Sequence, residues 1–178
     1  MSGIKGGKRM YPRASGTYDE CGTPSYAFWP LVTILPLGCT VWEPAPGEGL
    51  LARAMLDSGF SVVETSTDFF VTDAPPTADV LVTNPPYSIK YRWVERALSF
   101  GIPVALLMPV ESLGTGALWK ACGHVVPRMI LVSPRINFKM PHKGWEGTAQ
   151  FPTAWFCWGL GEGTEMVFQP KAERGCQG

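Results

Sequence analysis

Residues 39–49 read CTVWEPAPGEG, and this stretch decides the fold that the sequence predicts. The short, β-rich apolar run Cys39–Glu43 indicates a buried strand. Behind it, the spacing of Gly47 and Gly49 indicates a tight turn in which the backbone can pass close to a ligand. The apolar spacing over residues 50–56 then predicts a helix, which ends at the following Ser-Gly pair. A strand, a glycine turn and a helix in this order are typical of a ligand-binding α/β unit.

The same alternation of strands and helices continues along the rest of the chain. Apolar runs predict strands over Phe60–Glu64, Asp79–Thr83, Pro103–Met108, Arg128–Ser133 and Ala154–Trp158, and helices over Ser25–Leu35 and Tyr91–Phe100. This pattern predicts an α/β fold with a mainly parallel sheet and helices on both of its faces. Only fifteen positions separate Glu64 from Asp79, which is too few for a helix–strand–helix crossover. The middle of the fold is therefore expected to be abbreviated, with room only for a short strand over Asp68–Val71.

Length and composition limit the classes of protein to which the chain can belong. Its 178 residues fit one domain, expected over 17–165, between a flexible basic tail at 1–16 and a C-terminal tail at 166–178. The 46% hydrophobic and 17% charged residues exclude an intrinsically disordered chain. Because no apolar run reaches about 18 residues and the start lacks a signal-peptide core, we expect a cytoplasmic protein without a membrane partner. Five scattered cysteines, without a C-x-x-C pair, indicate neither a disulfide framework nor a zinc or other metal site.

The net charge is zero, so only the distribution of charge bears on a polyanionic partner. Between positions 43 and 79 lie seven acidic residues and a single basic residue. Positions 120–143 hold no acid and five bases, namely Lys120, Arg128, Arg135, Lys139 and Lys143. Such a basic patch could meet a nucleic acid even on a neutral protein, and a mixed solvated surface is the alternative that stays open.

The ends of the first two predicted strands carry a candidate ligand site. Glu43 can accept from an ammonium group, and the free N–H groups of the helix after Gly49 point into the same crevice. The turn is a poor phosphate cradle, because acids crowd it and no P-loop lysine follows. Glu64 stands where α/β nucleotide folds place an acid for the ribose hydroxyls, and Asp68-Phe69 offers an acceptor and an aromatic face for adenine. A tight turn without a ligand and a solvent-facing carboxylate are the alternatives.

The string Asn84-Pro85-Pro86-Tyr87, directly after the clearest predicted strand, is the most specific feature of the sequence. Its prolines stiffen the loop and remove two backbone donors, which leaves the Asn84 side-chain oxygen and the Pro85 carbonyl as acceptors. Two acceptors on the protons of a planar amino group can draw its nitrogen towards a pyramidal geometry and free the lone pair. They also stabilise the positive charge that builds as a methyl group arrives, and Tyr87 can stack on the planar substrate. A plain structural turn is the alternative.

At these residues the sequence resembles the class I S-adenosylmethionine-dependent methyltransferases, and within them the amino-methyltransferases typified by DNA N6-adenine enzymes. Residues 43–49 look like the cofactor motif of the family and residues 84–87 like its catalytic motif, in the same order. Thr23-Pro24 is similar to the threonine-proline pair that small phage-type adenine methyltransferases place ahead of the first motif. The resemblance covers residues 17–160.

The resemblance implies a Rossmann-like sheet of seven strands, mostly parallel with an antiparallel last strand, and S-adenosylmethionine as the methyl donor. The implied reaction is transfer of a methyl group to the exocyclic N6 amino group of adenine in DNA. The implied catalytic residues are Asn84, Pro85, Pro86 and Tyr87. The implied cofactor-binding residues are Tyr18, Thr23 and Pro24 near the methionine part, with Glu43, Pro44, Gly47, Gly49, Glu64, Asp68, Phe69 and Asn84.

No separate target-recognition domain fits into 178 residues, so we expect base choice to come from the loop Ser133–Phe151. Its basic residues, interleaved with aromatic ones, suit a nucleic-acid backbone with exposed bases, although an ordinary surface hairpin is the alternative. A homodimer would add area for contact with DNA. The expected substrate-binding residues are Ser88, Arg135, Phe138, Lys139, Lys143 and Trp145.

The catalytic motif alone does not decide the substrate. Bases in structural RNA and glutamine amides in proteins pose the same planar-nitrogen problem, so RNA and protein stay open as alternative partners. The glutamine enzymes usually carry an extra N-terminal helical domain that this sequence lacks, which places RNA ahead of protein. A third hypothesis is a non-catalytic, cofactor-binding subunit that works with a partner.

Overall fold

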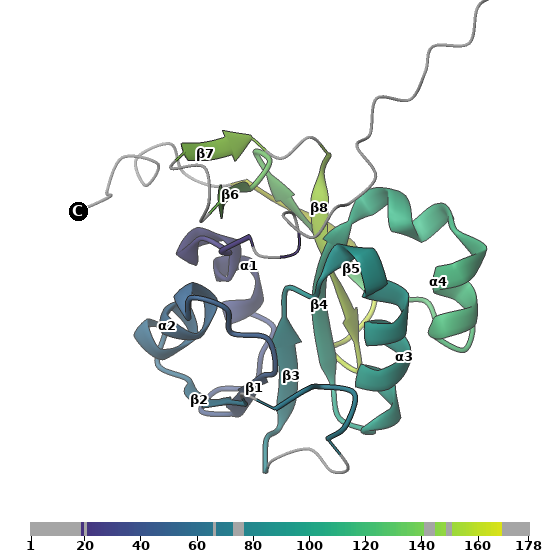
Figure 1. Cartoon of the computed structure of the whole chain (residues 1–178), viewed down its shortest axis with the longest axis horizontal. Coiled ribbons are helices and arrows are strands. Elements are labelled where there is room, and N and C mark those ends of the chain that lie inside the picture. The colour runs from purple at the N-terminus through teal and green to yellow at the C-terminus, as the bar shows by residue number, and fades with distance from the viewer. Residues whose placement is uncertain are drawn as a thin grey trace, which may run out of the picture.

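The computed structural model describes residues 19, 21–65, 67–72, 77–140, 145–148 and 151–168, and the backbone alone at 140, 145–148 and 165–168. Its centre is a sheet of seven strands in the order β2-β1-β3-β4-β8-β5-β9 (Figure 1). These strands are β1 (Thr40–Glu43), β2 (Ser61–Glu64), β3 (Val80–Thr83), β4 (Val104–Pro109), β5 (Arg128–Ser133), β8 (Thr153–Trp158) and β9 (Thr164–Phe168). A separate antiparallel hairpin joins β6 (Asn137–Met140) to β7 (Trp145–Thr148).

The predicted mainly parallel sheet is confirmed. β2, β1, β3 and β4 run parallel, and β8 is antiparallel to both of its neighbours, β4 and β5. The antiparallel strand is thus the one predicted at Ala154–Trp158, but it is not the last strand of the chain, because β9 follows it and runs parallel to β5. The sheet also continues past the domain boundary predicted at residue 165, since β9 ends at Phe168.

Helices cover both faces of the sheet, which explains why its central strands are apolar throughout. The helical elements are η1 (Ser25–Ala27), α1 (Trp29–Val32), α2 (Leu50–Asp57), η2 (Tyr87–Ile89), α3 (Lys90–Ser99), η3 (Val110–Gly114) and α4 (Gly116–Ala121). Alternate strand residues face two cores: Val41 packs with α1 and α2, whereas Trp42 packs with α3 and α4. In Figure 1 the two pairs of helices accordingly lie on opposite sides of the strands.

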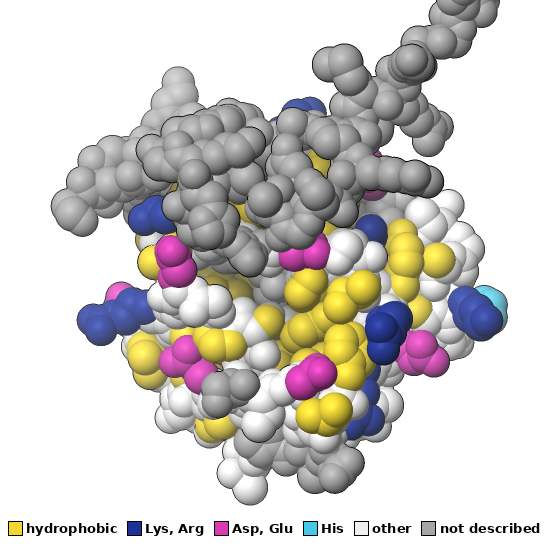
Figure 2. Space-filling view, viewed as in Figure 1, with side chains coloured by type: hydrophobic (Ala, Val, Ile, Leu, Met, Phe, Trp, Pro, Cys, Tyr) yellow, Lys and Arg dark blue, Asp and Glu magenta, His cyan; other side chains and the backbone are white. Residues whose placement is uncertain are grey.

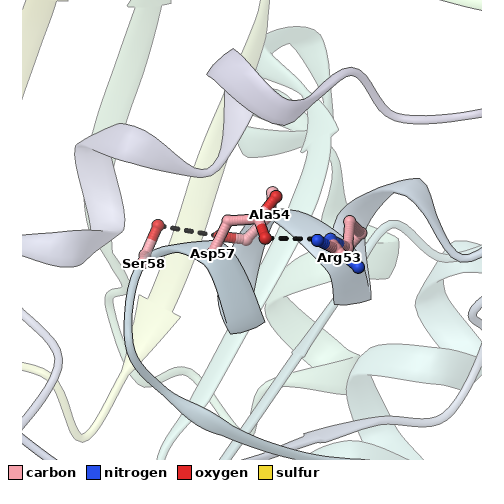
Figure 3. A network of polar contacts seen from close by, with 4 residues as sticks. All are labelled: Arg53, Ala54, Asp57 and Ser58. Atoms are coloured by element: carbon pink, nitrogen blue, oxygen red, sulfur yellow. Dashed lines mark hydrogen bonds and ion pairs between the residues drawn. The ribbon is translucent and has the colours of Figure 1, made fainter.

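The helix α2 holds the glycine turn against the sheet by burial and not by its surface charges. Leu51 and Met55 are buried in the core, and each such side chain contributes roughly 1.5–3 kcal/mol. Figure 3 shows the exposed side of the helix, where Arg53 Nε lies 2.8 Å from Asp57 Oδ1. The same view shows the Ser58 hydroxyl donating to the Ala54 carbonyl at the end of the helix, 2.7 Å away. An exposed ion pair of this kind contributes only about 0.3–0.5 kcal/mol.

Two local predictions differ from the structure. The predicted helix over Ser25–Leu35 is divided into η1 and α1, and Pro30, which has no backbone N–H, lies in the first turn of α1, where no such donor is needed. Asp68–Val71 forms turns and not a strand, since the Asp68 carboxylate accepts from the Phe70 N–H at 2.9 Å. The sequence interpretation also missed α4 and β9, and it gave a hairpin between residues 133 and 151 only as an alternative. Within the described residues, no helix is both long and apolar enough to cross a membrane.

Candidate active site

The carboxyl ends of the neighbouring strands β1 and β3 border a cavity of about 460 Å³, a size suited to a small-molecule ligand. The turn after β1 contributes residues 43–48, and Asn84 and Pro86 come from the loop after β3. The lining is completed by Asp19 and residues 21–23, by Leu50 and Leu51 of α2, and by Thr65 and Thr67 after β2. Figure 2 shows hydrophobic side chains gathered at the middle of the molecule, between α2 and α3, with acidic side chains at the margin. The two motifs singled out in the sequence therefore meet at one cavity.

Glu43 is a buried carboxyl group at the wall of this cavity. Its Oε1 accepts from the Ala45 N–H at 3.0 Å, whereas its Oε2 is buried and has no hydrogen-bond partner among the described residues. Burial raises the pKa of Glu43 to about 8, and the neighbouring Glu64 carboxylate adds to the rise. The Thr83 hydroxyl and the Ala45 N–H oppose the rise without offsetting it. A buried acceptor without a partner fits a ligand that brings a cationic donor.

The glycine turn has the backbone geometry that the sequence predicts. Gly47 and Gly49 adopt positive φ values of 54° and 75°. In the described part of the chain, no heavy atom lies within 4 Å of a Cβ built on either residue. Glycine is thus required at these two positions for its backbone conformation, because other residues rarely adopt positive φ values. The open space beside the turn leaves the N-terminus of α2 accessible from the cavity.

Replacing Gly49 with alanine is expected to lower the free energy of unfolding by about 1–2 kcal/mol, because alanine is strained at a positive φ. Gly116 is the matched control, since it also has space for a Cβ but lies at an ordinary φ in α4. Gly116→Ala should be neutral or stabilising. Urea denaturation of both variants measures the difference, and an equal loss of stability in the two would contradict the conformational explanation.

Asn84 has its side chain fixed by one hydrogen bond. Its Nδ2 donates to the Thr23 hydroxyl oxygen at 3.0 Å, across 61 positions of sequence. The other end of the amide, Oδ1, is buried and accepts from no group that the structure describes. Pro85 is buried behind it, and Pro86 is half-buried at the cavity. The amide of this cavity-lining residue thus has a buried acceptor without a described partner.

Tyr87, the last residue of the loop at 84–87, packs against the segment expected to bind substrate. Its ring contacts Phe138 edge-on at 6.4 Å between centroids and Phe151 at 5.9 Å with a tilt of 52°. Its hydroxyl is buried without a hydrogen-bond partner among the described residues, and burial raises its pKa well above the usual value, with the nearby Cys21 thiol adding to the rise. Tyr87 therefore stays protonated, and it is surrounded by aromatic rings that suit a planar substrate.

Several of the predicted cofactor residues come together at the cavity, namely Thr23, Glu43, Pro44, Gly47 and Asn84. Gly49 caps the start of α2 directly behind the turn, and Pro24 is buried beside Thr23 in the sequence. Tyr18 lies outside the described residues. Sequence reasoning missed Thr65 and Thr67 as residues of the cavity lining, because neither belongs to a recognisable sequence motif. Thr65 is held by the Trp42 indole N–H, which donates to its hydroxyl oxygen at 3.2 Å.

The structure does not bring Glu64, Asp68 and Phe69 to the cavity lining. Glu64 is exposed at the end of β2, where it is paired in register with Glu43. Asp68 uses its carboxylate within its own turn. Phe69 is 3% exposed and stacks on Trp93 of α3, with 4.0 Å between ring centroids and 8° between planes. Its ring belongs to the core and presents no face to a ligand in the cavity, contrary to the expectation.

Of the predicted substrate residues, Ser88 directly follows the loop at 84–87, and the others lie in or just before the segment that contains β6 and β7. Ser88 donates through both its N–H and its hydroxyl to the Asp19 carboxylate. Phe138 is buried against Tyr87, whereas Arg135 is exposed and Lys139 half-buried. The backbone of Lys139 exchanges two hydrogen bonds with Gly22, of 2.8 and 2.9 Å, which attach the hairpin to the wall of the cavity. Lys143 lies outside the described residues, and of Trp145 only the backbone in β7 is described.

In the parts of the chain that the structure describes, no three His, Cys, Asp or Glu side chains form a group that could hold a metal ion. The four cysteines in the described part of the chain form no disulfide with one another.

Comparison with known proteins identifies the fold. No family model matches the sequence, and no curated protein is found as a relative. A structure from Pyrococcus horikoshii, inferred to be an RNA methyltransferase, matches with a TM-score of 0.55 and 14% identity over 74% of this chain and 80% of its own. A structure from Listeria monocytogenes, inferred to be a class I S-adenosylmethionine-dependent methyltransferase, matches with a TM-score of 0.54 and 13% identity over 83% of this chain and 65% of its own. The chain therefore has the class I methyltransferase fold.

Proposed function

We propose that the protein transfers a methyl group from S-adenosylmethionine to the exocyclic N6 amino group of adenine in DNA. The observation that carries the proposal is the buried Asn84 Oδ1, an acceptor without a partner, beside a cavity that the glycine turn and Glu43 also line. The class I methyltransferase fold supports the choice of cofactor. The combination of an acceptor for an amino group with a cavity for a cationic ligand favours N-methylation.

The cavity has groups suited to each part of the cofactor. Glu43 Oε2 would accept from the ammonium group of the methionine part, and a bound cation would lower the raised pKa of this carboxyl group. The turn at Gly47 leaves room for the ligand to approach the backbone, and the hydroxyls of Thr65 and Thr67 are suited to the polar adenosine part. When bound, the cofactor supplies an electrophilic methyl group on a sulfonium.

Asn84 would act on the amino group of the target base. Its Oδ1 accepts one N–H of that group, which favours a pyramidal nitrogen whose lone pair can form the new N–C bond. The same oxygen stabilises the positive charge on the nitrogen while the C–S bond breaks and the sulfur takes up the bonding pair. The extra proton leaves the nitrogen afterwards, so no base with a shifted pKa is required. Tyr87, with Phe138 and Phe151 beside it, would hold a base flipped out of the stack.

The proposal is tested by incubating the purified protein with unmethylated DNA and S-adenosylmethionine labelled in its methyl group. Digestion to nucleosides and mass spectrometry should then find N6-methyladenine. Parallel incubations with RNA and with protein identify the other classes of substrate. Label in RNA or protein alone would contradict the DNA assignment, and cofactor binding in calorimetry without transfer to any of the three would indicate a non-catalytic subunit.

RNA is the second candidate substrate, because the Pyrococcus horikoshii structure that shares the fold is inferred to be an RNA methyltransferase. The chemistry at Asn84 is the same for an amino group in either polymer. The 2′-hydroxyl is what allows a protein to tell RNA from DNA.

Lys139→Ala is expected to weaken binding of nucleic acid by reducing contact with the phosphate backbone. Its side chain is half-buried on the hairpin attached to the cavity wall, close to the proposed position of the target base. Loss of one phosphate contact should lower the slope of log K against log salt by about 1, whatever the base sequence. Fluorescence anisotropy over a salt series measures that slope. Lys120→Ala in α4 is the control and should leave the slope unchanged, so an equal effect of both substitutions would contradict a local contact.

A further inference from the structure

Thr23 is a nearly inaccessible side chain that connects the cavity with the catalytic loop. It is 5% exposed, it contributes to the cavity lining, and its hydroxyl oxygen accepts from Asn84 Nδ2 at 3.0 Å. The resemblance to small adenine methyltransferases implies only that Thr23 helps to seat the methionine part of the cofactor. The hydrogen bond to Asn84 points to a different role, because it acts on the group that would contact the substrate.

A primary amide can occupy its site in two orientations that differ by a half-turn of the terminal group. In one, the oxygen is available to the substrate, and in the other the NH2 group takes its place. An NH2 group cannot accept a proton from the amino group of a base, so only the first orientation is productive. The structure has this orientation, with Nδ2 on Thr23 and Oδ1 buried without another partner among the described residues.

We propose that Thr23 is a positioning residue, whose hydroxyl oxygen holds the Asn84 amide by its NH2 group in the orientation that presents Oδ1 to the substrate. This inference rests on the proposed function for its effect on turnover, although the orientation itself can be measured without any substrate. In the structure the Thr23 hydroxyl oxygen accepts from the NH2 end of the amide. A hydroxyl can also donate, but a half-turn of the amide requires this hydrogen bond to break, whereas a methyl group in its place would hold neither end. Removing the hydroxyl therefore leaves part of the protein with Asn84 in the unproductive orientation.

The test replaces Thr23 with valine, which keeps the shape of the side chain and removes the hydroxyl, and with serine, which retains it. Thr153→Val is the matched control, because Thr153 is 1% exposed and its Oγ1 has no hydrogen-bond partner in the described residues. With saturating cofactor, Thr23→Val is expected to lower kcat about tenfold, which is the size of effect that one hydrogen bond supports. The affinity for S-adenosylhomocysteine should change less than twofold. Thr23→Ser should restore most of kcat, and Thr153→Val should leave it unchanged.

The second measurement observes the amide directly and needs no turnover. The side-chain NH2 signals of Asn84 in the nitrogen–proton NMR spectrum can be assigned by their loss in Asn84→Ala. In Thr23→Val these protons should exchange with solvent faster than in the wild type, and Thr23→Ser should restore the slow exchange. If the wild type transfers no methyl group but the exchange responds in this way, the proposed function fails and the positioning role stands. Unchanged NH2 signals in Thr23→Val, or an unchanged kcat with weaker cofactor binding, would overturn the positioning role.

Discussion

Asn84→Ala is expected to reduce kcat by about 10²–10³-fold, the usual cost of removing one preorganised group that stabilises charge in a transition state. The side chain provides the buried acceptor, Oδ1, that no other described group occupies. Alanine leaves the amino group of the substrate without that acceptor and also deprives the Thr23 hydroxyl of its partner. Steady-state transfer of labelled methyl groups at saturating cofactor measures the loss.

Asn84→Asp distinguishes the acceptor from the bulk of the side chain. Aspartate retains an oxygen towards the substrate, and the Thr23 hydroxyl can donate to its other oxygen, so this variant should keep more activity than the alanine variant. Thermal unfolding and the affinity for S-adenosylhomocysteine report whether either substitution disturbs the fold or the cofactor cavity. Equal activity in the alanine variant and the wild type would contradict a role for Asn84 in the chemistry.

Glu43→Gln is expected to make the protein more stable at and above neutral pH, although it removes a residue of the proposed site. The pKa of Glu43 is raised to about 8 in the folded protein, against 4.5 for an unperturbed glutamate. Between these two values the unfolded chain loses the proton while the folded protein keeps it, so stability falls as the pH rises and levels off above pH 8. The full difference is on the order of 5 kcal/mol.

Glutamine remains neutral in both states, so the variant should lack this decrease in stability between pH 5 and 8. Its amide oxygen can still accept from the Ala45 N–H, and its NH2 group can donate to the neighbouring Thr83 hydroxyl. Urea denaturation at a series of pH values measures the effect. Glu95→Gln, at an exposed position on α3, is the control and should reproduce the wild-type pH dependence. A wild-type curve that is flat from pH 5 to 8 would contradict the buried, protonated state of Glu43.

The same substitution should weaken binding of the cofactor. Because Glu43 is mostly protonated below pH 8, pairing with the ammonium of the ligand requires release of a proton. The affinity of the wild type for S-adenosylhomocysteine should therefore rise with pH between 6 and 7, where the ammonium group stays charged. Calorimetry should find this rise absent in Glu43→Gln. A gain in stability together with a loss of affinity separates the role of Glu43 in binding from any role in the fold.

Two parts of the molecule could be predicted from the sequence because their signals are local. The strand, glycine turn and helix over residues 39–57 follow from consecutive apolar residues and from two positions where only glycine is unstrained. The loop at 84–87 follows from its prolines, whose restrictions act on adjacent residues. Parallel strands bring their carboxyl ends to one edge of the sheet, which is why these two motifs border the same cavity.

Other features had no signal that sequence reasoning could use. The strand β9 follows a segment with three glycines, and its last three residues lie in the part of the chain that was expected to be a tail. It belongs to the sheet because Met129 N–H donates to the Gly163 carbonyl at 2.9 Å and the Arg128 side chain donates to the Leu160 carbonyl at 2.8 Å. Phe69 was assigned to a ligand because aromatic residues suit both a ligand and a core, and composition alone cannot separate the two. Its stacking on Trp93 depends on how α3 packs on the sheet.

The sequence by itself determined the order of the central strands and helices along the chain, the glycine turn, and the loop that holds Asn84. Each of these features depends on the conformational preferences of neighbouring residues. Only the tertiary structure decided that Thr23 meets Asn84 across 61 positions and that Glu43 is buried deeply enough to hold a proton near neutral pH. Hydrogen bonding and desolvation depend on which groups surround an atom in space. Those surroundings are fixed by packing between segments that lie far apart along the chain.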